Sequence, residues 1–192
     1  MKHIEDNKIE SALFGIFNPA HPEKIEGYFS DILFADPVEI DAPIELVWSV
    51  ITDFHLYPLW NPLIRSFQLD TTAKLGEIAT FTVSWGPYMK DGLNVPVSNL
   101  KVSLTQHEKI TVWQPNSCLA YADDLGVWHR AERTQYISAL PNGHTCYYTY
   151  ERWAGLITPL IRLAYAEKTR AAFNAANMAL KMRAEALVKG MS

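Results

Sequence analysis

Apolar and polar residues alternate at two different periods near the start of the organised part of the chain. Residues 38–41, Val-Glu-Ile-Asp, alternate with period two, which is typical of a half-buried strand. Immediately afterwards Ile44, Val47 and Ile51 follow helical spacing. Pro43 precedes them, where the first turn of a helix tolerates proline. The pattern therefore predicts a strand that leads directly into an amphipathic helix.

The middle of the chain has the pattern of an antiparallel meander. Two prolines in residues 57–64 restrict that segment to a short helical turn. Short runs rich in strand-forming residues follow, and turn-forming residues separate most of them. These predicted strands are residues 66–69, 79–85, 101–105, 110–113 and 119–122. Short strands in series with local turns are expected to form an antiparallel sheet.

Residues 127–153 are predicted to form a hairpin with a defined register. The turn at 140–144, Leu-Pro-Asn-Gly-His, has the chemistry of a three-residue loop in which Gly143 takes a left-handed conformation. An opposite-charge pair then falls on each face at the same level, which favours this register over a one-residue slip. The predicted pairs are Arg133 with Glu151, Gln135 with Thr149 and Ile137 with Tyr147 on one face, and Glu132 with Arg152 and Tyr136 with Tyr148 on the other.

Residues 157–189 have a helical pattern throughout, and they lack Gly and Pro after Pro159. A helix of this length extends roughly 45 to 50 Å. Its apolar residues form one stripe, which consists of Phe173, Ala176, Leu180, Ala184 and Leu187. A narrow stripe of small and large residues suits a helix that lies across a curved sheet.

Residues 1–36 differ from the rest of the chain, because prolines and glycines interrupt them and only residues 11–17 are strongly apolar. We therefore treat them as an N-terminal extension and residues 37–192 as the domain. The apolar stretch Ser-Ala-Leu-Phe-Gly-Ile-Phe is too short to form a core of its own. We expect it to pack on the domain or on a partner, such as a second copy of the chain.

Composition narrows the functional classes. The 192 residues suit one domain, and 17 basic against 21 acidic residues give a net charge of −4, which argues against a nucleic-acid surface. No run of about 18 apolar residues and no signal-peptide core is present, so we expect a cytoplasmic protein without integral membrane association. The two cysteines lack metal-ligand spacing, and neither a metal nor a cofactor is expected.

Three segments of the sequence resemble motifs of a known family. Residues 38–64, which begin Val-Glu-Ile-Asp-Ala-Pro-Ile-Glu-Leu-Val-Trp, closely resemble the opening signature of the polyketide cyclase/dehydrase-like branch of the START/Bet v 1 (SRPBCC) superfamily. Residues 151–160 and 173–185 are similar to its last strand and closing helix. The resemblance covers about residues 37–189 and leaves out residues 86–100.

This resemblance implies an α+β helix-grip fold. In that fold a curved antiparallel sheet wraps around a long C-terminal helix, and two short helices follow the first strand. The space between sheet and helix encloses a cavity for a small hydrophobic ligand. Strand residues that face inward are then the candidate lining, and the aromatic content of 12% suits a ring-lined cavity.

The family architecture assigns the inner face of the last hairpin to the cavity. Tryptophans from earlier segments and one phenylalanine of the C-terminal helix are candidate walls. The predicted ligand-binding residues are Trp60, Trp85, Trp113, His129, Arg133, Gln135, Tyr147, Thr149, Glu151, Trp153 and Phe173.

The charged members of this set carry the candidate chemistry. Arg133 and Glu151 inside an apolar cavity are costly unless they pair, so they either form a structural salt bridge or fix a polar group of the ligand. An imidazole such as His129 transfers protons near neutral pH, although it can equally be a hydrogen-bonded core residue. The candidate catalytic residues are His129, Arg133 and Glu151.

Three functions remain open from the sequence. The first is binding of a lipid, an aromatic or a polyketide-like molecule. The second is an aromatase/cyclase or dehydratase-type enzyme that acts by proton transfer on such a ligand. The third is a protein-interaction module, in which the extension covers a partner. Motifs for nucleotide binding, serine hydrolysis and zinc chemistry are absent from the sequence.

Overall fold

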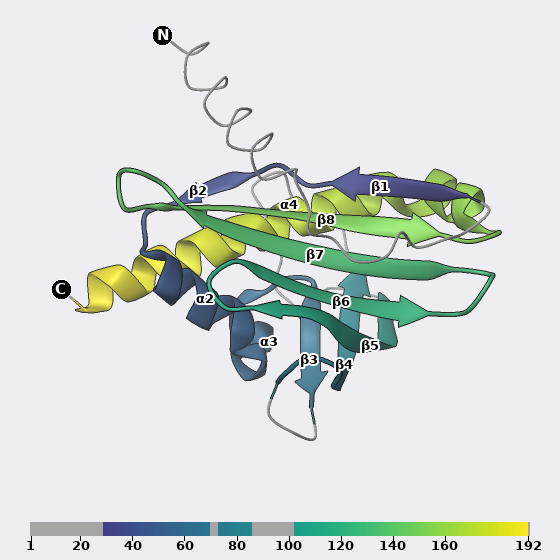
Figure 1. Cartoon of the computed structure of the whole chain (residues 1–192), viewed down its shortest axis with the longest axis horizontal. Helices are drawn as coiled ribbons and strands as arrows, with labels where there is room; N and C mark the ends of the chain where they lie inside the picture. The colour runs from purple at the N-terminus through teal and green to yellow at the C-terminus, as the bar shows by residue number, and fades with distance from the viewer. Residues whose placement is uncertain (1–28, 70–72, 86–101, 192) are drawn as a thin grey trace, which may run out of the picture.

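The computed structural model describes residues 29–69, 73–85 and 102–191. Within these ranges one curved, open antiparallel sheet lies against a long C-terminal helix, and two short helices follow the first strands (Figure 1). The helix-grip fold predicted from the sequence is therefore confirmed. In chain order the elements are β1 (Ser30–Phe34), β2 (Val38–Ile40), α2 (Ile44–Thr52), the 3-10 turn η1 (Phe54–Leu56), α3 (Tyr57–Trp60), β3 (Ile64–Gln68), β4 (Ile78–Trp85), β5 (Val102–Gln114), β6 (Cys118–Asp124), β7 (Arg130–Ala139), β8 (Thr145–Ala154) and α4 (Thr158–Met191).

The strands follow the order β1-β8-β7-β6-β5-β4-β3, and β2 also pairs with β8. The meander from β3 to β8 is sequential, so each strand pairs with its neighbour in the chain. β1 lies inside the stretch treated as an extension, yet it pairs with β8 from Ser30 opposite Ala154 to Phe34 opposite Tyr150. Its Leu33 side chain is buried in the core. This part of the extension therefore belongs to the sheet.

The hairpin of β7 and β8 has the predicted register. Arg133 lies opposite Glu151, and the other four predicted pairs are also present. The Leu140 amide donates to the His144 carbonyl at 2.8 Å, and Gly143 has a φ of 83°. Pro141 and the polar residues of the turn thus set which residues of β7 and β8 lie opposite each other.

One strand boundary was predicted wrongly. The sequence predicts separate strands at residues 101–105 and 110–113. The structure has one strand, β5, across residues 102–114. Its neighbours β4 and β6 supply the hydrogen bonds that hold the polar residues 106–109 extended.

The concave face of the sheet packs on α2, α3 and α4. The helical stripe predicted for α4 faces inward, because Phe173, Ala176, Leu180 and Ala184 are all buried. The opposite face of α4 is exposed and carries charged residues as well as large apolar ones such as Leu160 and Leu163. Within the described ranges no helix is both long and apolar enough to cross a membrane. A cytoplasmic location stays a prediction.

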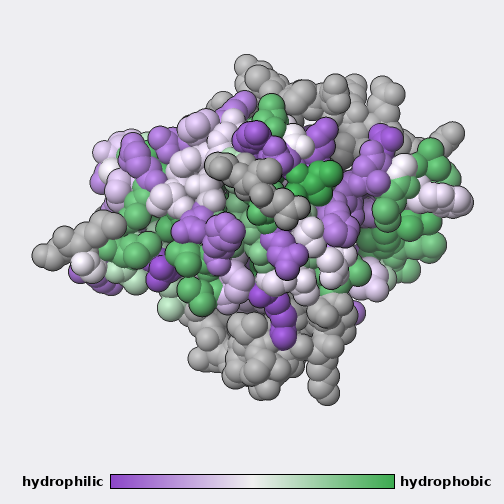
Figure 2. Space-filling view, turned by 90° about the horizontal axis from the view of Figure 1, so that it is seen from below, coloured by the Kyte–Doolittle hydropathy of each residue, from purple (hydrophilic) through white to green (hydrophobic). Residues whose placement is uncertain are grey.

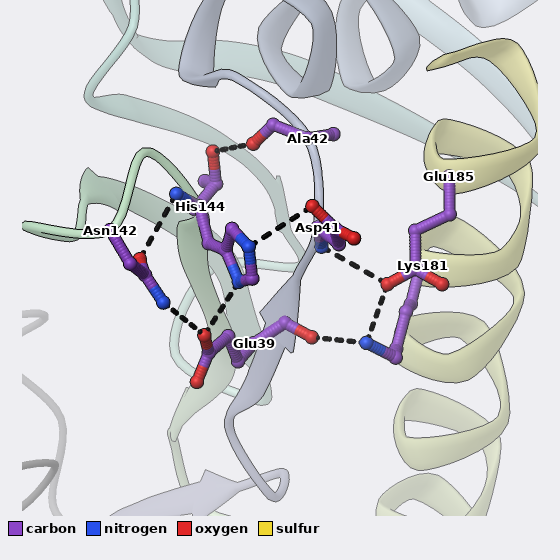
Figure 3. Close-up of polar contacts among 8 residues, drawn as sticks. Glu39, Asp41, Ala42, Asn142, His144, Lys181 and Glu185 are labelled. Atoms are coloured by element: carbon purple, nitrogen blue, oxygen red, sulfur yellow. Dashed lines mark hydrogen bonds and ion pairs between the residues drawn. The ribbon is translucent and has the colours of Figure 1, made fainter. Parts of the chain in front are cut away.

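A polar cluster joins the C-terminal half of α4 to β2 and to the β7–β8 turn (Figure 3). His144 contacts Glu39 Oε1 through Nδ1 at 2.7 Å and Asp41 Oδ1 through Nε2 at 3.0 Å. Lys181 Nζ donates to the Glu39 carbonyl and to Glu185 Oε1, both at 2.6 Å. The Asp41 amide also donates to Glu185 Oε1, at 3.0 Å. We call these five residues the clasp; it fixes this end of α4 on the sheet.

Candidate functional site: a cavity between the sheet and the C-terminal helix

A cavity of about 40 Å³ lies between the sheet and α4. One side is apolar and the other is polar. The lining residues are Leu63, Ile64, Phe81, Val83 and Phe173 on the apolar side, and Gln106, Glu108, Tyr121, Arg133 and Glu151 on the polar side. This volume holds about three water molecules, whereas an engineered cavity that takes up benzene measures about 150 Å³. A ring-sized ligand therefore needs the walls to move apart.

Strand pairing brings the polar side chains together. Tyr121 on β6 lies opposite Arg133 on β7, and Arg133 lies opposite Glu151 on β8. Ile110 on β5 lies opposite Tyr121, and Glu108 is two residues before it on the same face of the strand. Four neighbouring strands thus each contribute at least one polar group to the cavity.

Arg133 is only 5% exposed and has no carboxylate partner among the described residues. Its Nε donates to Thr149 Oγ1 at 3.3 Å, and its guanidinium carbon lies 4.2 Å from the centre of the Phe173 ring. In the described part of the chain no ion pair within 4.0 Å joins Arg133 to Glu151, although the two are cross-strand neighbours. Burial by itself lowers the pKa of Arg133, but the surrounding phenols and Glu151 raise it by more. The pKa is therefore raised overall, and the side chain stays charged. The structural salt bridge that the sequence left open is not formed.

The two carboxyl groups of the cavity hold protons unusually well. Burial raises the pKa of Glu151 to about 7, although a hydrogen bond with Trp153 and the charge of Arg133 act against the rise. The pKa of Glu108 is well above its ordinary value because of burial and of repulsion by Glu151 and Asp123. At neutral pH the site therefore combines Glu151 near its midpoint, the cation of Arg133, and a second carboxyl, Glu108, whose pKa is well above its ordinary value.

Three predicted ligand-binding residues, Gln135, Tyr147 and Thr149, are buried and bonded to their neighbours. The Tyr147 hydroxyl donates to Gln135 Oε1 at 2.8 Å, and Gln135 Nε2 donates to the Tyr121 hydroxyl at 3.4 Å. Thr149 accepts the Arg133 hydrogen bond. None of the three lines the cavity. They hold Tyr121 and Arg133 in place, and direct contact with a ligand stays a prediction.

His129 lies at the edge of the sheet, just before β7 begins. Its ring centre is 6.5 Å from that of Trp153, and it does not line the cavity. Burial lowers the pKa of His129, while the nearby Asp123 raises it. Its Nδ1 and one oxygen of Asp123 are buried without a hydrogen-bond partner among the described residues. A catalytic role for His129 stays a prediction.

The predicted tryptophan walls pack elsewhere in the core. Trp60 and Trp113 each meet another aromatic ring edge-on, with ring centres 4.9 and 5.6 Å apart. Trp153 is buried in the same core. None of these three lines the cavity, and the side chain of Trp85 lies outside the described residues. Their contact with a ligand also stays a prediction.

The cavity therefore shares Arg133, Glu151 and Phe173 with the set predicted from the sequence. The most important residue that the sequence analysis missed is Glu108. It lies between the two predicted strands 101–105 and 110–113, and in β5 it alternates with Gln106 and Ile110 along one face. In the part of the chain that the structure describes, no group of three His, Cys, Asp or Glu side chains is placed to hold a metal.

Comparisons with known proteins agree with this fold. A START superfamily protein from Mycobacterium smegmatis superposes with a TM-score of 0.58 at 17% identity, covering 82% of this chain and 98% of its own. The Zhui aromatase/cyclase from Streptomyces sp. R1128 gives 0.61 at 13% identity, covering 85% and 99%. The protein TTHA0849 from Thermus thermophilus gives 0.58 at 14% identity, covering 82% and 99%.

Identities this low show the fold alone, and no curated protein matches the chain. The family described as polyketide cyclase/dehydrase and lipid transport matches residues 19–185, which is most of the sequence. The resemblance stated from the sequence is confirmed. The chain belongs to the polyketide cyclase/dehydrase and lipid transport family.

Proposed function

We propose that this protein binds a small hydrophobic molecule, such as an aromatic, lipid or polyketide-like compound, whose polar group lies against Arg133. The observation that carries the proposal is a buried arginine, without a carboxylate partner among the described residues, at the polar end of a cavity whose other walls are apolar. A buried charge without a counterion is costly, and an anionic or carbonyl oxygen of a ligand offsets that cost. The family assignment supports the same class of ligand.

The protonation of the two carboxyls favours an anionic group. Below pH 7 Glu151 is mainly neutral, and the pKa of Glu108 is also raised, so the two carboxyls of the described cavity lining oppose the positive charge of Arg133 less than ordinary glutamates would. Above pH 7 Glu151 ionises and repels a second anion. Binding of an anion is therefore coupled to proton uptake by Glu151, and it weakens as the pH rises through about 7.

The test is isothermal titration of the full-length protein with benzoate and benzamide, which share a ring and differ in charge. We expect benzoate to bind about tenfold more tightly at pH 6 than at pH 8, with little change for benzamide. Arg133→Met should weaken benzoate binding at least tenfold, which corresponds to about 1.4 kcal/mol. The matched control is Arg152→Met, because this arginine is the next residue after Glu151 and points to the other face of β8.

Native mass spectrometry before and after solvent extraction tests the proposal without a chosen probe. We expect the untreated protein to carry a small molecule that extraction removes and that Arg133→Met retains less well. Absence of a retained molecule, together with benzoate binding that Arg133→Met leaves unchanged, would contradict the proposal.

A second function, proton transfer on the bound molecule, has its own supporting observation. Glu151 has a pKa of about 7, which is the value at which a general base works best at neutral pH. As a carboxylate it can take a proton from the carbon next to a ketone, while Arg133 stabilises the enolate oxygen that forms. Return of the proton from Glu151 to a different carbon of a conjugated enolate completes an isomerisation. In a cyclisation the enolate carbon bonds to a second carbonyl carbon of the ligand, and the proton goes to the alkoxide that forms. In a dehydration the C–O bond of a β-hydroxyl breaks, and that hydroxyl takes the proton and leaves as water.

Exchange of the α-protons of 2-tetralone in D₂O, followed by proton NMR, tests this second function. We expect the wild-type protein to accelerate exchange, with a rate that rises as the pH passes through 7. Glu151→Gln should lose the acceleration, whereas Glu132→Gln on the outer face of β7 should keep it. Exchange equal to the buffer rate in all three proteins would leave binding as the function.

A further inference from the structure

The molecule carries a second apolar feature at the end opposite to the clasp. There the β6–β7 turn meets the start of α4, and Figure 2 shows hydrophobic residues gathered at the same end, on the right in both views. Trp128 is 60% exposed and Leu163 is 88% exposed. We call this surface the apolar end; it consists of Leu125, Val127, Trp128, Leu156, Leu160 and Leu163. Grouped exposed apolar side chains of this size mark interaction sites on soluble proteins.

The backbone beneath the apolar end is held firmly. The Leu156 amide donates to the Val127 carbonyl at 3.0 Å, and the Ile157 amide donates to the Trp128 carbonyl at 3.1 Å. Gly155 allows the two backbone segments to lie this close together, because a Cβ there would lie 2.5 Å from the Trp128 carbonyl oxygen. The apolar end is therefore a fixed surface rather than a collapsed loop.

The charges around the apolar end argue against an anionic lipid surface as the partner. Arg130 is paired with Asp124 at 3.0 Å, and Arg162 is paired with Asp31 at 2.8 Å. These pairs neutralise the two arginines at the rim, and the whole chain has a net charge of −4. The partner that fits is apolar and needs no anionic group.

The chain itself supplies such a partner. The described residues begin at Phe29, whose carbonyl accepts the Gly155 amide at 2.9 Å beside the apolar end. Residues 11–17 are apolar and end 29 − 17 = 12 residues before this point. Twelve residues span at most about 40 Å, so the stretch can reach the apolar end, and the short tether raises its effective concentration to the millimolar range. We infer that residues 11–17 of the same chain dock on the apolar end.

Paramagnetic relaxation NMR on the full-length protein tests the docking. A nitroxide is attached at Asn7→Cys, because the native Cys118 and Cys146 are buried. Docking predicts strong broadening of the methyl signals of Leu125 and Leu160 and of the Trp128 indole signal. The double substitution Phe14→Ser and Phe17→Ser should remove most of that broadening. Leu59 on α3, which is 76% exposed, is the control signal and should stay sharp.

A mixed sample separates docking within one chain from docking between two. It contains isotope-labelled protein without nitroxide and nitroxide-labelled protein without isotope, and docking within the chain predicts no broadening in it. Broadening in the mixed sample would assign the apolar end to a second copy and overturn the inference. Absence of broadening in the doubly labelled chain would also overturn it. The same holds if phosphatidylcholine vesicles shift the signals of the apolar end while the nitroxide does not broaden them.

Discussion

Two residues that face each other across adjacent strands, Arg133 and Glu151, do not form an ion pair. Burial keeps Glu151 partly protonated at neutral pH, while Thr149 and the Phe173 ring hold Arg133 from two sides. Each group is therefore left with capacity to contact a third molecule. A buried pair that neutralised itself would have shaped the sheet without offering a binding group.

The raised pKa of Glu151 makes folding stability depend on pH. From its ordinary value of 4.5 the pKa rises to about 7 in the folded protein, so the unfolded chain releases this proton first as the pH increases. The free energy of unfolding therefore falls between about pH 4.5 and 7, by roughly 3 kcal/mol. Urea unfolding should show that Glu151→Gln becomes more stable relative to wild type over this window.

The control for that measurement is Glu132→Gln, a carboxyl removed from the outer face of the neighbouring strand. Its stability relative to wild type should not follow the same rise. A difference between Glu151→Gln and wild type that is constant from pH 4.5 to 8 would show that Glu151 ionises in the folded protein as it does in the unfolded chain.

Sequence reasoning reached Arg133 and Glu151 because a turn and two charge pairs fixed the register of their hairpin. It could not predict the pKa values of these two residues, because those values depend on burial by residues from distant strands and from α4. Glu108 was missed for a different reason. Its neighbours in the sequence are also polar, so no apolar–polar alternation marks the inner face of the strand there. The pairing of β5 with β4 and β6 is needed to show that Glu108 faces the cavity.

At the scale of elements, α4 is attached to the sheet by different contacts at its two ends. At the clasp, Lys181 Nζ donates to the Glu39 carbonyl and Glu185 accepts from the Asp41 amide, while ion pairs join His144 of the turn to Glu39 and Asp41. At the other end Arg162 of α4 pairs with Asp31 on β1, and the two residues just before α4 donate backbone hydrogen bonds to the β6–β7 turn. Exposed ion pairs contribute little to stability individually, and salt weakens them. Separate substitutions therefore test the two ends.

A double-mutant cycle measures the clasp. We expect His144→Ala and Glu39→Gln to show a coupling energy of about 0.5 to 1 kcal/mol in urea unfolding, falling at high salt. His107→Ala is the control, because His107 contacts a neutral hydroxyl, Thr80 Oγ1, at 2.9 Å. Additive effects of the two clasp substitutions at low salt would show that the contacts add nothing to stability.

Two glycines with positive φ give a matched test of the other end. Gly155 has a φ of 131° and would place a Cβ against the Trp128 backbone, whereas Gly143 has a φ of 83° and open space around it. Gly143→Ala should cost about 1 kcal/mol of unfolding free energy. Gly155→Ala should cost at least about 2 kcal/mol more than Gly143→Ala, because strain and steric overlap add. Equal costs would show that the β6–β7 turn is not held against the end of β8.

The periodicity of the sequence predicted α4, the β2–α2 unit and the last hairpin, because each has a long or well-punctuated pattern. It did not predict β1, since Ser30–Phe34 is a short run that becomes a strand only by pairing with β8. Long-range pairing also joined the two halves of β5. Both differences arise where a neighbouring strand, rather than local preference, determines the backbone.

At the scale of the whole molecule, the sheet, α3 and α4 enclose a space that is nearly filled. The sequence predicted an internal cavity from the family architecture, and the structure has one, but its volume is only about 40 Å³ and half of its lining residues are polar. Cavity volume could not be predicted, because it depends on how side chains from several strands and a helix fill the same space. A ligand of ring size must separate these walls when it binds.

The proposed chemistry of the cavity depends on one carboxyl that titrates near neutral pH and on a second whose pKa is well above its ordinary value. Carbon-13 NMR of the glutamate carboxyls in the full-length protein, from acidic to alkaline pH, tests it most directly. We expect one signal with a midpoint near 7 that disappears in Glu151→Gln. We also expect a second signal, absent in Glu108→Gln, that stays protonated where surface glutamates have ionised. Titration of both carboxyls near the ordinary value of 4.5 would show that the cavity raises neither pKa, which would contradict the proposed site.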